Sequence, residues 1–190
     1  TSAAENILAE FRKITDLPLK AIILTHSHRD HVSGASVFVE GNSPEILAST
    51  RFSNDSLFVA SNHPQPVKAM QMRTKRQFGI GLSYPDEIVG IGVGPGKRPL
   101  KGMGAGAMTP TRRIGDEGEK LTIHGIDLEL VRAPGETPDH IVVWYPAKKI
   151  LISGDNFYRS FPNLYAIRGT AYREFDAWAD TMDLLMEFKP

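Results

Sequence analysis

Apolar positions in the first half of the chain predict short helices around buried strands. In segment 2–14 they recur three and four residues apart, which is the spacing of an amphipathic helix. The runs 19–24 and 44–49 are short and apolar, so both are predicted to be buried strands. A short helix is expected to begin at 35–38, and a longer one is expected at 66–78.

The second half changes to strand-like spacing after a long irregular stretch. Glycine and proline are too dense in 80–106 for a regular element, which indicates a long loop. Alternating apolar residues predict one hairpin at 121–131 and a second at 141–153. Three-to-four spacing at 175–186 predicts a final helix. Strands with helices on both sides indicate a layered α/β domain.

Composition narrows the class of protein. The 190 residues are 41% hydrophobic, which is enough for the core of one domain. The formal net charge is zero, which argues against a nucleic-acid-binding protein. The short basic stretches 72–76 and 111–113 are interpreted as solvated faces or as the lip of an anion site. Cysteine is absent, no apolar run is long enough for a transmembrane segment, and no compartment is indicated.

A cluster of metal-binding side chains follows the first predicted strand. Four such side chains fall within six positions: His26, His28, Asp30 and His31. Three of the six histidines of the chain are therefore in this one segment. Side chains alternate along an extended segment, so His26 and His28 are expected to point to one side. A helix beginning near Asp30 would fold Asp30 and His31 back beside them. Imidazole and carboxylate donors that converge in this way bind zinc and its neighbours, so the sequence predicts a metal site.

Two later segments also lie at predicted strand ends, where sites on open sheets collect. Segment 133–140 comes directly before a strand, and 153–156 comes directly after one. Glu136 or His140 could complete the ligands of a first metal, and Asp155 could bridge to a second. Glu136 could instead be an exposed turn carboxylate, and His140 a packing residue. The two isolated histidines are interpreted as surface residues: His63 and His124.

These motifs resemble a known family. Residues 25–31 match the His-x-His-x-Asp-His signature of the metallo-beta-lactamase superfamily, and segment 133–155 is similar to its later metal motifs. Glu136 stands where that superfamily normally has histidine. A glutamate at this position resembles the alkylsulfatase branch of the superfamily. Segment 161–169 resembles the stretch with which that branch grips sulfate. The resemblance implies an αββα sandwich.

The resemblance also implies two zinc ions, or other first-row metals, and a set of site residues. The ligands of the first ion would be His26, His28 and Glu136. The second ion would take Asp30 and His31, with Asp155 bridging the pair. Asp30 and Asp155 are thereby expected among the catalytic residues. The sulfate would be gripped by Asn163, Tyr165 and Arg168.

The implied activity is binuclear hydrolysis of a small anionic ester, a sulfate ester, with a metal-bound hydroxide as nucleophile. The sequence leaves open whether the C–O or the S–O bond breaks. It also leaves open hydrolysis of a thioester, lactone, β-lactam or phosphodiester. A third alternative is a catalytically impaired scaffold with the same fold.

The chain departs from the family pattern at both ends. The family's first strands precede the histidine motif, and its last metal-binding histidine follows the final helix; neither is expected here. We therefore expect 1–190 to be a single domain that is a fragment of a longer chain. This expected fragment would lack N-terminal strands and a C-terminal segment, and a homodimer could form through regions absent from it.

Overall fold

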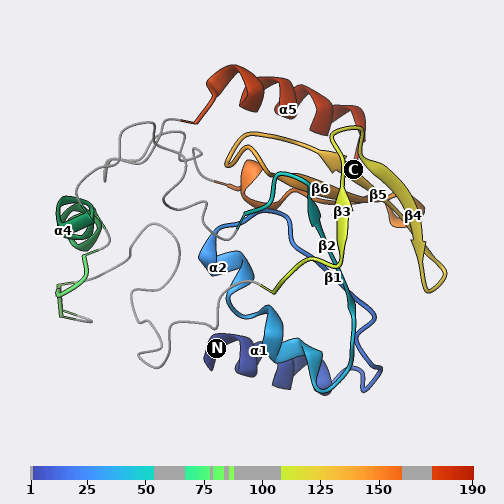
Figure 1. Ribbon diagram of the computed structural model, residues 1–190, viewed down its shortest axis with the longest axis horizontal. Helices are drawn as coiled ribbons and strands as arrows, with labels where there is room; N and C mark the ends of the chain where they lie inside the picture. Colours follow the sequence, from blue (N-terminus) through green and yellow to red (C-terminus); the bar gives the residue numbers. More distant parts are fainter. Residues whose placement is uncertain (1, 54–66, 78, 84–85, 88–107, 160–172) are drawn as a thin grey trace.

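The described part of the chain contains two stacked sheets between helices (Figure 1). The computed structural model describes residues 2–53, 67–77, 79–83, 86–87, 108–159 and 173–190.

The first sheet is parallel. Its strands follow the order β1 (Ala21–Ile23), β2 (Glu45–Ser49) and β3 (Arg112–Ile114). Ile22 lies opposite Ile46, and Ala48 lies opposite Arg113. Because all three strands run in one direction, their carboxyl ends lie at one edge, where ligand sites of parallel sheets form.

Helices cover one face of this sheet. They are α1 (Ser2–Arg12), α2 (Arg29–Val32) and the 3-10 helix η1 (Ala35–Val39). Ile46 and Ala48 of β2 pack with Val32 of α2 on this face. Leu47, between them in sequence, is fully buried on the opposite face, as the two-residue period of a strand requires.

The second sheet is antiparallel and follows sequence order. It contains β4 (Glu119–Ile123), β5 (Ile126–Arg132), β6 (Ile141–Tyr145) and β7 (Ile150–Ile152). A short 3-10 helix, η2 (Pro146–Lys148), joins the last two strands. Both hairpins expected from the sequence are confirmed in these four strands.

The main core lies between the two sheets. Leu47 and Ile114 of the first sheet pack with Leu130 and Val143 of the second, all nearly or fully buried. On its other face the second sheet packs against α5 (Phe175–Glu187), where Leu185 contacts the β6 side. The layers therefore run helix, sheet, sheet, helix, with α1 at the bottom and α5 at the top of Figure 1. The αββα arrangement expected from the resemblance is confirmed.

Other expectations differ in detail. The sequence did not predict a strand at β3, where two of the three residues are arginines. The helix expected at 66–78 is α4 (Val67–Gln77). The loop expected at 80–106 lies largely outside the described residues. Among the described helices, none is both long and apolar enough to cross a membrane.

Candidate metal centre

The first two histidines lie in the loop that follows β1. The backbone of this loop is tied to the second sheet, because Ile141 N–H donates to Thr25 C=O at 2.9 Å. The His26 side chain is fully buried, and its Nδ1 lies 3.1 Å from the Thr25 hydroxyl. Its Nε2 is buried without a hydrogen-bond partner. One ring nitrogen is thus fixed by the protein while the other is left for a ligand, as in metal-binding histidines.

The next two predicted ligands lie on α2. This helix begins at Arg29, one residue before the start expected near Asp30, and brings Asp30 and His31 back toward the loop. His31 Nε2 lies 3.1 Å from Asp155 Oδ2 and 3.6 Å from Asp30 Oδ2. The Asp30 side chain is 81% exposed, so this side of the site opens to solvent.

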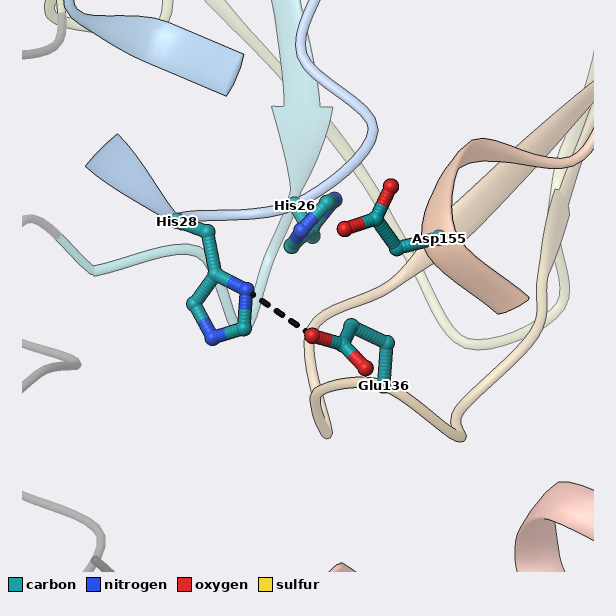
Figure 2. A group of neighbouring side chains, drawn as sticks. All are labelled: His26, His28, Glu136 and Asp155. Atoms are coloured by element: carbon teal, nitrogen blue, oxygen red, sulfur yellow. Dashed lines mark ion pairs between the residues drawn. The ribbon is translucent and has the colours of Figure 1, made fainter. Parts of the chain in front are cut away.

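Glu136 is a buried carboxylate. Its side chain is only 7% exposed, so the alternative of an exposed turn carboxylate is wrong. Its backbone N–H donates to Asn156 Oδ1 at 2.8 Å, which fixes the loop. The carboxylate Oε1 lies 3.2 Å from His28 Nδ1 (Figure 2). Its other oxygen accepts a hydrogen bond from Arg173, a contact that the sequence did not suggest.

Asp155 connects two groups of donors. It lies in η3 (Gly154–Asn156), the 3-10 turn after β7. Donor atoms of His26, His28, Glu136 and Asp155 all lie within 4.8 Å of one another, and Figure 2 shows these side chains converging. Donor atoms of Asp30, His31 and Asp155 meet the same limit. Asp155 is therefore shared by a four-residue group and a three-residue group.

His140 packs behind the donors. It is fully buried and stacks on the His26 ring, with centroids 4.7 Å apart and an interplanar angle of 18°. It belongs to neither donor group among the described residues. Burial lowers the pKa of His140 to about 4, so the ring is neutral at physiological pH. The packing interpretation fits this position, and His124 is exposed, as expected.

The charges of the site suit a cation. Burial, reinforced by the neighbouring imidazoles, holds the pKa of His26 far below its ordinary value. The hydrogen bond between His31 and Asp155 raises the pKa of the histidine and lowers that of the aspartate. Zinc binds neutral imidazole and ionised carboxylate. The shifted pKa values of His26 and Asp155 favour these forms, whereas on His31, whose pKa is raised, a metal would displace a proton.

The residues present fit a divalent metal. The first group offers four nitrogen and oxygen donors, which is the usual number for zinc, and it includes a buried imidazole nitrogen with no other partner. The second group offers three donors among the described residues.

Some site residues fall outside what the structure describes, and others were missed. Asn163, Tyr165, Arg168 and His63 lie outside the described residues. Arg173 was missed because it lies 37 positions from its partner Glu136. Asn156 was missed because no local pattern distinguishes a buried asparagine from the turn asparagines common at strand ends.

Comparison with known proteins decides the family. The model of the Metallo-beta-lactamase superfamily matches residues 1–50 and 72–189. The chain belongs to the metallo-beta-lactamase superfamily.

Within this superfamily the chain is similar to alkylsulfatases. It is 32% identical over 191 residues to a linear primary-alkylsulfatase of Pseudomonas sp., covering 98% of this chain and 35% of the relative. It is 29% identical over 188 residues to the alkyl/aryl-sulfatase BDS1 of Saccharomyces cerevisiae, and the alignment covers 96% of this chain and 28% of that relative. The chain thus spans about a third of the length of these curated relatives.

A solved structure agrees on the metallo-beta-lactamase fold. The stereoselective inverting sec-alkylsulfatase Pisa1 from Pseudomonas sp. superposes with a TM-score of 0.72 at 23% identity. The superposition covers 95% of this chain and 29% of Pisa1.

Proposed function

We propose that this chain carries the two-metal site of a hydrolase that cleaves sulfate esters, as alkylsulfatases do. The observation that carries the proposal is the position of Asp155, which is shared by two donor groups. A carboxylate in this position can hold two cations side by side. The similarity to two alkylsulfatases over nearly the whole chain favours a sulfate ester over other substrates.

The donor side chains would divide between two zinc ions. His26, His28 and Glu136 would hold the first ion. Asp30 and His31 would hold the second, and Asp155 would bridge the two. Bound there, two divalent cations would supply a nucleophile by lowering the pKa of a water to near neutrality.

Side chains of the protein set the direction from which a substrate would approach and the groups that would bind its sulfate. The buried His26 and Glu136 close the inner side of the site, whereas Asp30 lies at its solvent-exposed side. A substrate is therefore expected to approach from the side of α2. Arg168 would receive the sulfate, because a guanidinium donates paired hydrogen bonds to two oxygens of such an anion. Asn163 and Tyr165 would add neutral donors.

A substrate panel tests the proposal. The zinc-loaded protein is incubated separately with dodecyl sulfate, a β-lactam, a lactone, a thioester and a phosphodiester. We expect release of inorganic sulfate from dodecyl sulfate at a rate far above turnover of the other four. Hydrolysis of one of the others without sulfate release would replace the sulfatase assignment with that activity. Zinc binding without any hydrolysis would favour a scaffold that has kept the fold.

A further inference from the structure

A buried ion pair joins Arg173 to the candidate metal ligand Glu136. Arg173 Nη1 donates to Glu136 Oε2, and the two side chains are only 11% and 7% exposed. Arg173 lies two residues before α5, outside both donor groups. Burying a charge is costly unless it is paired, so this contact stabilises both charges in their buried positions.

The contacts divide the carboxylate of Glu136 between two tasks. Oε2 is held by Arg173, while Oε1 faces His28 Nδ1 at 3.2 Å inside the donor group. The backbone N–H of Glu136 is fixed separately by Asn156. Both ends of the residue are therefore held, and one carboxylate oxygen is left to face the site.

The pair also balances charge. Glu136 places a full negative charge where an imidazole ligand would place none, and the Arg173 guanidinium cancels it within hydrogen-bond distance. With this cation beside it, Glu136 resembles a neutral ligand in the net charge that it brings to the site. A ligand set with less negative charge leaves a bound cation a stronger Lewis acid.

Attachment of α5 does not depend on this ion pair. Trp178 Nε1 donates to Asn156 C=O at 3.1 Å, and the Thr181 hydroxyl donates to Pro134 C=O at 2.6 Å. Leu185 adds a buried apolar contact with the second sheet. These contacts fix the helix to η3, to the loop that carries Glu136 and to the second sheet.

We propose that Arg173 is a positioning residue of the metal site: it orients Glu136 to bind through one oxygen and offsets the charge of that ligand. The proposal rests on the metal site of the proposed function and adds to it a residue that contacts the ligand Glu136 and belongs to neither donor group among the described residues. Residues that orient a ligand typically contribute about 10- to 100-fold to metal affinity.

Zinc affinity of three variants tests this role. Arg173→Met removes the charge and the donors, and Arg173→Lys keeps the charge but loses the planar fork of donors. Arg12→Met is the matched control, because Arg12 of α1 also pairs with a glutamate, Glu40. Helix α1 lies on the opposite side of the two sheets from α5 (Figure 1). Affinity is measured on purified protein by competition with a chromogenic chelator. The absorption spectrum of the cobalt-substituted protein reports the ligand geometry directly.

The expected result is specific to Arg173. Arg173→Met should weaken zinc binding about 10- to 100-fold and change the cobalt spectrum. Arg173→Lys should recover part of the affinity, and Arg12→Met should match the wild type in both measurements. Wild-type affinity together with a wild-type cobalt spectrum in a folded Arg173→Met protein would overturn the inference.

A second background separates charge compensation from general damage. In a Glu136→His protein position 136 no longer carries a carboxylate for Arg173 to orient, so adding Arg173→Met should cause no further loss of zinc affinity. The same fold loss in both backgrounds would overturn the inference. Because zinc affinity is measured without substrate, absence of sulfate release would count against the proposed activity and leave the role of Arg173 standing.

Discussion

Gly154 shows how closely single residues are fitted around the site. Its φ is +55°, and a Cβ added there would lie 2.6 Å from the buried His140 ring. Gly125 has a similar φ of +83°, but nothing lies within 4 Å of its added Cβ. The two positions thus share the backbone conformation and differ in the available space.

Gly154→Ala is predicted to destabilise the protein more than Gly125→Ala. The left-handed conformation costs each alanine about 1–2 kcal/mol. Overpacking against His140 should cost Gly154→Ala about 1–3 kcal/mol more. Urea unfolding of the metal-free proteins measures both losses. Equal losses would show that the His140 ring moves aside freely.

Arg168 provides the residue-scale test of the substrate class. Loss of a charge-assisted hydrogen bond is worth about 1.5–3 kcal/mol, so Arg168→Met should lower kcat/KM for dodecyl sulfate at least about tenfold. Arg168→Lys should fall between Arg168→Met and the wild type, because it keeps the charge alone. Zinc content should be unchanged in both variants. A wild-type kcat/KM in the Arg168→Met variant would show that Arg168 is not part of the proposed sulfate site.

Individual residues were predictable where their contacts are local. His26, His28, Asp30 and His31 are close in sequence, and one strand end followed by a helix brings them together. Arg173 and Asn156 were not predictable, because their contacts with the Glu136 loop span 37 and 20 positions. Burial of Glu136 depends on the same long-range packing.

At the scale of elements, Asn156 fastens three of them together. Its Oδ1 accepts from Glu136 N–H at 2.8 Å, and its Nδ2 donates to Ala133 C=O at 2.6 Å. Its own C=O accepts from Trp178 of α5. One fully buried side chain therefore connects η3 with the loop before β6, while its backbone holds the last helix.

Asn156→Ala is predicted to lower the free energy of unfolding by about 2–3 kcal/mol, because two buried backbone groups lose their partner. Asn42→Ala is the control, since Asn42 makes one side-chain hydrogen bond, to Val39 C=O at 3.0 Å, from a half-buried position. The Asn42→Ala variant should lose about 1 kcal/mol or less of unfolding free energy. Chemical denaturation of metal-free protein measures the difference. Similar losses in the two variants would contradict the role given to Asn156.

Elements were predictable where the apolar period was long enough to identify. The hairpins β4–β5 and β6–β7 and the helices α1 and α5 follow their sequence patterns. β3 was missed because it has only three residues, and its arginines form contacts that pattern alone cannot show: Arg112 pairs with Glu119, and Arg113 donates to Phe52 C=O.

At the scale of the whole molecule, a charged group links the two sheets. Asp116 accepts from Arg51 at 2.5 and 3.0 Å, and it lies 3.3 Å from Arg132 at the end of β5. The hydrogen bond from Arg51 is the main cause that lowers the pKa of Asp116 below the ordinary value of an aspartate.

A group with a lowered pKa stabilises the fold above its unfolded pKa, and this contribution is lost as pH falls through the folded value. Asp116→Asn should therefore be less stable than the wild type at pH 7. The difference should shrink as pH falls below the ordinary aspartate pKa and through the lowered pKa of Asp116. Unfolding free energies across this range measure it, with Glu117→Gln as a neighbouring exposed control. A difference independent of pH would assign the effect to something other than the charge.

The central claim is that two donor groups sharing Asp155 hold two divalent cations. The most direct measurement is the number of zinc equivalents that the metal-free protein binds, determined by titration with metal analysis of the product. We predict two equivalents for the wild type and fewer for Asp155→Ala. Fewer than two equivalents in the wild type would contradict the two-metal account.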